Sequence, residues 1–134
     1  MSRAGRGKLL TILIVDDTAG CRNVVARLLK QGGFDSTCSC NGSEALAALE
    51  LTVPALILLD LAMPVMDGLT FLSILRGDTR WSHLPVIVIS GESEDGLMRQ
   101  ATKLGATEVL SKGKFTTPQL LASISRHVPA GPMN

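Results

Sequence analysis

Short apolar runs alternate along this chain with stretches in which apolar residues recur at helical spacing. This alternation is typical of β-α units that build a parallel sheet. The first, third and fourth runs are nearly continuous Val, Ile and Leu, as expected for strands covered on both faces, whereas the second is polar and is predicted to be an edge strand. The expected strands are residues 11–16, 34–38, 55–60, 85–90 and 107–111.

The intervening stretches each carry one apolar stripe, which predicts five helices that pack on the sheet. Gly32-Gly33, Gly105 and Pro129 are expected to end the first, fourth and fifth helices, and residues 93–95 to cap the start of the fourth. The fold class is therefore α/β, with a doubly wound, five-stranded parallel sheet and five flanking helices. The stripes are Val24, Val25, Leu28 and Leu29; Leu46 and Leu49; Leu69, Leu72 and Leu75; Leu97, Met98, Ala101 and Leu104; and Leu120, Leu121, Ile124 and Val128.

The length of 134 residues fits one domain. We expect this domain to span residues 9–128, preceded by a disordered basic arm (1–8) and followed by a Pro/Gly tail (129–134). No apolar run approaches the roughly 18 residues that a membrane-spanning helix needs.

The N-terminal residues resemble a secretory signal, because a basic segment precedes the apolar residues 9–15, and residues 18–21 resemble a lipoprotein cleavage site. Asp16 and Asp17 lie directly between these two features. Two acids at this point favour a buried strand over a signal segment, so a cytoplasmic protein is expected.

Composition excludes two classes of partner. The net charge of +1 and the pI near 7.8 give no electrostatic footprint for nucleic acid or an acidic membrane. Aromatic residues make up 3% of the chain, too few for a base-stacking platform.

Three cysteines, an odd number without C-x-x-C spacing, are predicted to be reduced thiols and not a zinc or redox site. Cys38 and Cys40 lie two apart in a predicted strand, so we expect them to share one buried face as small hydrophobic residues. His83 and His127 are expected on the surface.

Met63 and Met66 are predicted to be packing residues. Trp81, shortly before Pro85, is either a loop anchor or a partner contact.

Polar residues end the apolar runs abruptly. Parallel strands bring these ends to one edge of the sheet, where ligands bind in open α/β folds. Crowded carboxylates require a cation, and an all-oxygen set with few protein ligands suits Mg²⁺. A lysine and a hydroxyl beside them suit the oxygens of a transferred phosphoryl group. The residues are Asp16, Asp17, Asp60, Ser90 and Lys112.

Each of these residues alone has a plain structural explanation. Asp16-Asp17 could cap a helix, and Asp60 could be a capped loop acid. Ser90 could be a turn serine and Lys112 a solvated surface charge. Their joint occurrence at four strand ends favours a site. Residues 67–68, an Asp-Gly pair, are predicted to be a turn and helix start and not a ligand.

Over residues 9–128 the chain resembles the receiver domains of bacterial two-component response regulators, among them the chemotaxis receivers. Residues 12–17 are similar to the first strand and acidic pair of that family, residues 60–68 to its phosphoacceptor segment, Ser90 to its hydroxyl position and Lys112 to its lysine. The resemblance implies a flavodoxin-like sheet of order 2-1-3-4-5.

The resemblance also implies phosphoryl transfer from a histidine kinase or phosphotransfer protein onto Asp60. By the same resemblance, Mg²⁺ is held by Asp17, Asp60, Asp16 through water, and the backbone carbonyl of Ala62. Such a domain catalyses its own phosphorylation and dephosphorylation and is not a turnover enzyme. Its partners would be the phosphodonor, a downstream protein, and a second copy bound through the fourth helix, fifth strand and fifth helix.

Further roles follow from position in the family pattern. The phosphoryl group would be bound by Ser90, Lys112 and the backbone of Gly91. Ser90 and Val109 occupy the switch positions, and Ala62 and Glu92 the positions that tune the lifetime of the phosphoryl group.

Two residues depart from the family pattern. Val109 stands where Tyr or Phe is common, and Gly113 follows Lys112 where a cis proline is frequent. Because valine is stiff about χ1, we expect signalling through loop and helix movement. With Gly91 and Gly96 nearby, a mobile loop and a soft start of the fourth helix are expected.

Two alternatives remain. One is a receiver-like scaffold that binds partners without switching, as Val109 and Gly113 would allow. The other is a phosphatase that uses Asp60 as nucleophile, which is weakened because Ala62 stands where such enzymes usually carry a second acid.

Overall fold

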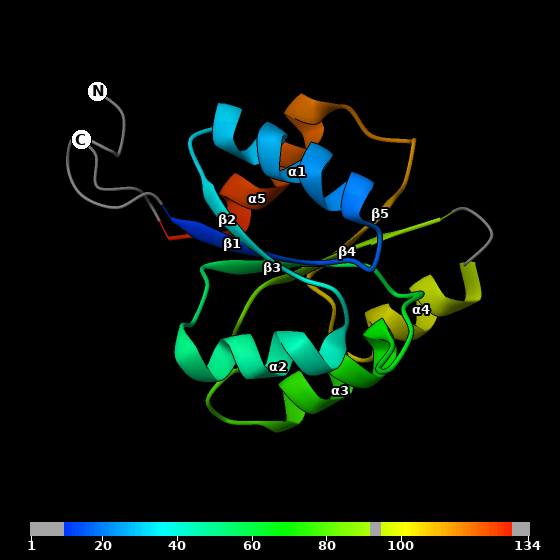
Figure 1. Cartoon of the computed structure of the whole chain (residues 1–134). Helices are drawn as coiled ribbons and strands as arrows, with labels where there is room; N and C mark the ends of the chain where they lie inside the picture. The colour runs from blue at the N-terminus through cyan, green and yellow to red at the C-terminus, as the bar shows by residue number, and fades with distance from the viewer. Residues whose placement is uncertain (1–9, 92–94, 130–134) are drawn as a thin grey trace.

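The structure, a computed structural model, describes residues 10–91 and 95–129 without the side chain of Asp95. Five parallel strands lie in the order β2-β1-β3-β4-β5. Helices α1 and α5 cover one face of the sheet and α2, α3 and α4 the other (Figure 1). The predicted fold class is confirmed. The elements are β1 (Thr11–Val15), α1 (Ala19–Gln31), β2 (Asp35–Ser39), α2 (Gly42–Leu51), β3 (Leu56–Leu59), α3 (Gly68–Gly77), β4 (Val86–Ser90), α4 (Asp95–Lys103), β5 (Glu108–Ser111) and α5 (Thr117–His127).

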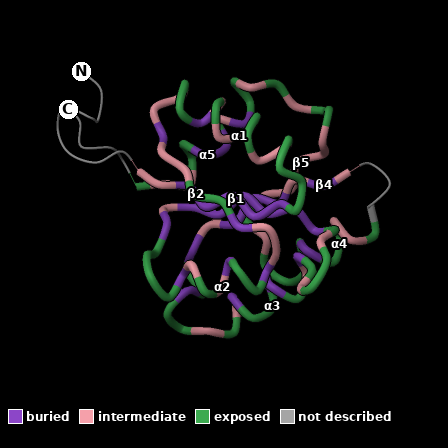
Figure 2. Tube along the Cα trace, viewed as in Figure 1, coloured by how far each residue is buried: buried purple, intermediate pink, exposed green. Residues whose placement is uncertain are grey.

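The strands β1, β3 and β4 form the buried centre of the sheet (Figure 2). Side chains of successive residues point to opposite faces, so Ile12 and Ile14 pack under α1 and α5, while Leu13 and Val15 pack under α2 and α3. All four are at most 3% exposed. This two-sided burial is the physical reason for their continuous apolar sequence.

The polar second strand lies at the sheet edge, as predicted. Its bounds differ by one residue, because β2 begins at Asp35 and ends at Ser39. Cys38 is exposed and Cys40 follows the strand, so the expectation that these cysteines share a buried face is wrong. An edge strand is covered on fewer sides, and this leaves Cys38 in solvent.

Helix termini follow the local signals in the sequence. Asn41 caps α2 by accepting the N–H of Glu44, and Thr116 and Gln119 form a reciprocal capping box at the start of α5. Gly32 ends α1 and α5 ends at His127. The expected cap at 93–95, Glu92, the basic arm and the tail beyond Pro129 lie outside the described residues.

Other predicted packing roles can now be assigned. Met63 and Met66 pack against the core cluster, as expected. Trp81 is 5% exposed, which favours a loop anchor, and its ring faces the Arg80 guanidinium at 4.1 Å. Within the described ranges no helix is long and apolar enough to cross a membrane.

A polar cluster ties the end of α5 to the start of β5. Glu108 accepts hydrogen bonds from Ser123 Oγ (2.8 Å) and Arg126 Nη2 (2.9 and 3.0 Å). Nε2 of His127 lies 2.5 Å from Glu108 Oε2. His127 is half-buried and has a structural partner in Glu108. The carboxyl end of a helix favours a cation, and Arg126 in the last turn of α5 supplies one there.

The pKa of Glu108 results from two opposing effects. Burial raises it, but hydrogen bonds from Ser123, His127 and Arg126 outweigh burial and lower the pKa from 4.5 to about 2. The folded state thus holds the carboxylate ionised at a pH where the unfolded chain protonates it.

We predict an acid-dependent loss of stability through Glu108. Its contribution to folding is fully present above the unfolded pKa and disappears as the pH falls from 4.5 toward about 2. The free energy of unfolding of Glu108→Gln, measured by urea titration, should therefore fall less steeply than that of the wild type in this interval. Glu50→Gln, which removes an exposed acid, is the control. Parallel slopes for wild type and Glu108→Gln would contradict the prediction.

Candidate phosphoryl and metal site

Three carboxylates meet at the carboxyl edge of the central strands. Asp16 and Asp17 follow β1, and Asp60 follows β3. One carboxylate oxygen from each lies within 4.8 Å of the others. Asp16 and Asp60 are 8% and 6% exposed, whereas Asp17 is exposed. The predicted convergence of these acids at one edge is confirmed.

The strand register accounts for this convergence. Val15 pairs with Leu59, and the N–H of Asp60 donates to Val15 O at 2.9 Å. On the other side the N–H of Asp16 donates to Ser39 O at 3.1 Å. Both acids thus continue the sheet ladder by one residue beyond the strands, so hydrogen bonds to neighbouring strands fix the position of their backbones.

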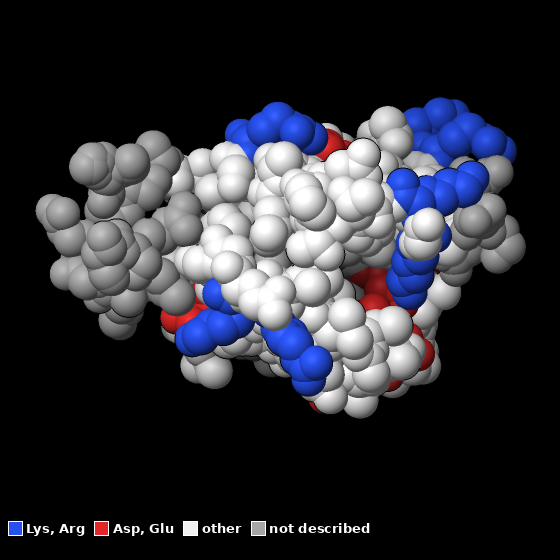
Figure 3. Space-filling view, turned by 90° about the horizontal axis from the view of Figure 1, so that it is seen from above, with Lys and Arg blue, Asp and Glu red and all other residues white. Residues whose placement is uncertain are grey.

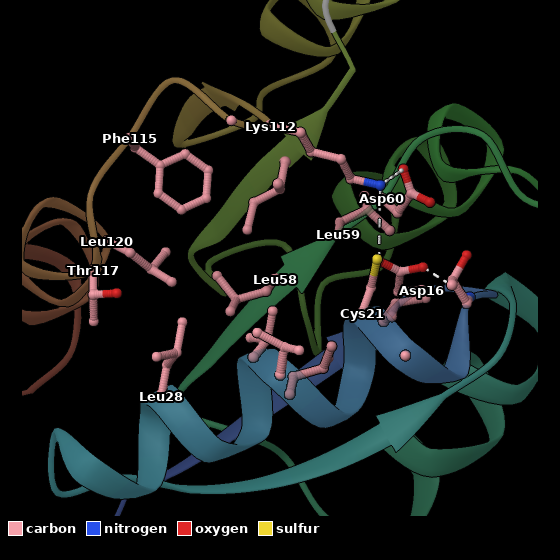
Figure 4. Close-up of a pocket in the computed structure, with 18 residues that line it drawn as sticks. Asp16, Cys21, Leu28, Leu58, Leu59, Asp60, Lys112, Phe115, Thr117 and Leu120 are labelled. Atoms are coloured by element: carbon pink, nitrogen blue, oxygen red, sulfur yellow. Dashed lines mark hydrogen bonds and ion pairs between the residues drawn. The ribbon is translucent and has the colours of Figure 1, made fainter.

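Lys112 is the cation beside these acids. Its Nζ lies 3.7 Å from Asp60 Oδ1 and 4.0 Å from Asp16 Oδ2, and its side chain is 39% exposed (Figure 4). Its backbone N–H donates to Ser90 O at 2.8 Å, which joins the end of β5 to the end of β4. Ser90 is fully buried, and Gly91 follows it at the same edge.

Gly113 shapes the turn after Lys112. Its φ is +79°, and the N–H of Lys114 donates to Ser111 O across the turn at 3.0 Å. A positive φ at the third position of such a turn favours glycine. Gly113 therefore fixes a tight turn after the lysine where the family often has proline.

Contacts from the β1–α1 loop and from the first turn of α1 fix the Asp16 carboxylate and backbone. Asp16 Oδ1 accepts the N–H of Thr18 at 2.9 Å, and Asp16 O accepts Arg22 Nη1 at 2.7 Å. Thr18, not the acid pair, is the N-cap residue of α1. No sequence pattern indicated Arg22. Every residue has a backbone carbonyl, so a side chain that donates to one requires no particular partner residue in the sequence.

The β3–α3 loop passes close to the Asp60 backbone. Gly68 donates its N–H to Leu61 O at 2.9 Å, and a Cβ at Gly68 would lie 2.5 Å from Asp60 O. Asp67 caps α3 by accepting the N–H of Thr70 at 2.8 Å, which confirms the predicted helix start. Val65, at φ +67°, forms a strained, exposed turn in the same loop.

The remaining predicted residues lie around this centre. Ala62 is exposed and lines a shallow hollow together with Asp17. Val109 pairs with Val88 in the sheet and packs, half-buried, against the core cluster under α2, α3 and α4. Glu92 and the loop expected to be mobile lie outside the described residues.

The donor set fits a hard divalent cation. Carboxylate oxygens are the ligands that Mg²⁺ prefers, and a site with few protein ligands leaves room for the waters that this ion retains. Figure 3 shows acidic atoms in a hollow of the surface beside a column of basic residues. The structure thus combines a place for a cation with a positive side chain for an anion.

We predict that Gly68→Ala perturbs both the site and the fold. The nearest atoms to the added Cβ are backbone atoms, Asp60 O and Leu61 Cα at 2.5 and 2.7 Å, so the loop must shift. Overpacking of this kind costs about 1–3 kcal/mol. Urea titration should show a lower free energy of unfolding, and Mg²⁺ titration should show a lower affinity for the ion. Gly77→Ala in the same helix meets no atom within 4 Å and should be neutral or stabilising. Equal stability and equal Mg²⁺ affinity of the two variants would contradict the close approach of Gly68 to the Asp60 backbone.

Comparisons with known proteins agree with this geometry. A family model described as the response regulator receiver domain matches residues 12–125. Protein PilG of Pseudomonas aeruginosa is 32% identical over 123 residues, which cover 90% of this chain and 89% of PilG. The response regulator Rre1 of Synechocystis is 36% identical over 104 residues, 77% of this chain but only 45% of Rre1.

Solved structures show the same architecture. The chemotaxis protein CheY4 of Vibrio cholerae superimposes with a TM-score of 0.80 at 28% identity, covering 90% of this chain and 99% of CheY4. The receiver domain of NtrX from Brucella abortus gives 0.79 at 30% identity, covering 87% and 96%. Because the family model spans most of the chain and the fold agrees, this protein belongs to the response regulator receiver domain family of two-component systems.

Proposed function

We propose that residues 9–128 form a receiver that accepts a phosphoryl group from a phosphohistidine onto Asp60 with the aid of Mg²⁺. The observation that carries this proposal is the position of Asp60: a carboxylate 6% exposed, within 4.8 Å of two other acids and 3.7 Å from Lys112. A buried carboxylate so placed is suited to covalent catalysis.

The proposed reaction is a transfer of the phosphoryl group with no change of oxidation state. A carboxylate oxygen of Asp60 forms a bond to phosphorus as the bond from phosphorus to the donor imidazole nitrogen breaks. The electron pair of that bond stays with the ring nitrogen, and the donor leaves as neutral imidazole after its ring takes up one proton from solvent. The product is an aspartyl phosphate, and the protein contributes positioning and charge neutralisation.

Asp17, Asp60, Asp16 through water, and the backbone carbonyl of Ala62 would hold the Mg²⁺ ion. When bound, the ion neutralises charge on the phosphoryl oxygens. The register of β1 with β3 supports this set, because it presents two carboxylates side by side on hydrogen-bonded backbones. The exposure of Asp17 and Ala62 gives the ion and its waters access from solvent.

Lys112 would donate to a phosphoryl oxygen. It already lies at the Asp60 carboxylate, so it could follow the charge from carboxylate to phosphoryl group with little side-chain movement. Ser90 and the backbone N–H of Gly91 would bind further phosphoryl oxygens. The hydrogen bond from Lys112 N–H to Ser90 O couples the ends of β4 and β5, so a change at one is transmitted to the other.

Switching would then move the segments that follow β4 and β5. Val109 is half-buried among core residues and is stiff about χ1, which supports a movement of loops and helices over a side-chain rotation. Ala62 and Glu92 would tune the lifetime of the aspartyl phosphate.

The partners proposed are a histidine kinase or phosphotransfer protein and a downstream protein target, with a homodimer through α4, β5 and α5 as one form of output. The chain would act on itself and not turn over free substrates. A cytoplasmic site of action fits the three free thiols.

Incubation with Mg²⁺ and acetyl phosphate should add one phosphoryl group to the wild type, measured as intact mass. Asp60→Asn removes the nucleophile and should gain none, while the isosteric control Asp67→Asn, at the α3 cap, should still be labelled. Absence of labelling in the wild type, together with constitutive partner binding, would support the non-switching scaffold instead. Multiple turnovers of unrelated phosphomonoesters would support a phosphatase.

Removal of the lysine charge should separate metal binding from phosphoryl transfer. In Lys112→Ala the acids lose their neighbouring cation, so Mg²⁺ should bind more tightly in calorimetric titration. Labelling by acetyl phosphate should slow by about 10²-fold or more, the cost of removing one donor to developing oxyanion charge. Lys114→Ala, at the last position of the same turn, is the matched control. Weaker metal binding in Lys112→Ala would argue against this electrostatic role.

A further inference from the structure

A groove runs from the acidic site along the face of the sheet between α1 and the β5–α5 segment. Its volume is about 670 Å³, within the range of small-molecule sites. Figure 4 shows side chains from both helices and from β3 directed into it, with Lys112 and Asp60 at one end and Leu28 and Thr117 toward the other.

The walls of this groove are mainly apolar. Val25 and Leu28 come from α1, Leu58 from β3, and Phe115 and Leu120 from the opposite side. Leu58 and Leu120 are buried, but Val25, Leu28 and Phe115 remain partly exposed although they pack on the core cluster or line the groove. The groove therefore keeps apolar surface in contact with water, which an apolar occupant would release.

The charged groups of the groove lie at one end, and the other end carries the Thr117 hydroxyl. Asp16, Asp60 and Lys112 gather at the charged end. This distribution matches a molecule with an apolar body and one polar head. A peptide segment would present polar backbone groups along its whole length, and the described apolar walls offer few partners for them.

We propose that this groove binds a small amphiphilic anion, with its hydrocarbon chain between α1 and Phe115 and its anionic head at Lys112. The inference rests on the proposed function, because the head group would occupy the place of the phosphoryl group beside Mg²⁺. Such a ligand would compete with phosphorylation of Asp60, so the receiver would respond to it as well as to a phosphodonor.

The net charge of the site determines whether the head group is an anion or a cation. Three carboxylates and one lysine leave a net charge of two negatives, which Mg²⁺ brings to zero. An anion can then approach Lys112 without net repulsion, whereas in the metal-free site the acids would repel it. Binding should therefore depend on Mg²⁺.

Calorimetry with n-octylphosphonate below its micellar concentration tests the proposal, with methylphosphonate, butylphosphonate and hexylphosphonate as a length series. In Mg²⁺ we expect one ligand per chain and an affinity that rises about threefold to fourfold per methylene until the groove is filled. In EDTA, binding should weaken by at least tenfold. In parallel, n-octylphosphonate should slow labelling of Asp60 by acetyl phosphate.

Val25→Phe places extra volume in the groove. It should lower the affinity for n-octylphosphonate at least tenfold and leave the affinity for methylphosphonate unchanged. Val53→Phe makes the same replacement at an exposed position that does not line the groove and should leave both unchanged. Thermal unfolding of both variants establishes that they fold. The length series on the wild type tests the proposal even if Val25→Phe does not fold.

Affinities independent of chain length, or equal in EDTA and Mg²⁺, would overturn the inference. So would a result in which no phosphonate binds but Val25→Phe loses labelling by a phosphohistidine protein, which would assign the groove to that protein. Labelling of Asp60 without any effect of n-octylphosphonate would refute this inference alone. Absence of labelling and of Mg²⁺ binding would refute the proposed function as well.

Discussion

Electrostatic repulsion among three carboxylates at one edge of the sheet is the constraint on which the rest of this structure depends. Two unit charges 4.8 Å apart repel by about 3 kcal/mol at an effective dielectric constant of 20. Asp16 and Asp60 are nearly buried, so solvent relieves little of this cost for that pair. Lys112 offsets part of it, but its side chain is 39% exposed and its attraction is correspondingly screened. The site is therefore poised to take up a further cation.

The parallel sheet is what maintains this unfavourable arrangement. Asp16 and Asp60 continue the ladder of backbone hydrogen bonds, and the strands β1 and β3 that precede them are buried on both faces. Moving Asp60 away from Asp16 would break the ladder and expose core residues such as Leu59. The apolar core thus supplies the free energy that keeps like charges together, and a functional site is where such a local conflict is expected.

Glu108 at the opposite end of the strands shows the contrasting case. It too is partly buried, but Ser123, Arg126 and His127 satisfy its carboxylate within the protein. Its pKa falls to about 2 because the fold provides the partners. At Asp60 the fold brings two further acids close to the carboxylate, beside a lysine that Asp60 shares with Asp16. The first cluster stabilises the attachment of α5, whereas the second keeps an excess of negative charge that a cation would offset.

Local pattern in the sequence determined the strands, the helices and the acids that end them. A run such as Leu56–Leu59 must be buried on both faces, so Asp60 after it had to lie at a buried sheet edge. Caps such as Asn41 and Thr116 act within one helical turn, so they can be predicted from neighbouring residues in the sequence. The family resemblance added the roles expected of Asp60 and Lys112. It depends only on the order of these residues along the chain, which the sequence shows without any distances.

Only the tertiary structure decided contacts between residues far apart in the chain. The pair of Glu108 with His127, the approach of Gly68 to Asp60 and the bond from Arg22 to Asp16 depend on how whole elements pack, which no periodicity encodes. Solvent exposure of Cys38 likewise followed from its place at an edge and not from its type. The groove beside Asp60 belongs to the same class, because it exists only where α1 and the β5–α5 segment leave space over the sheet.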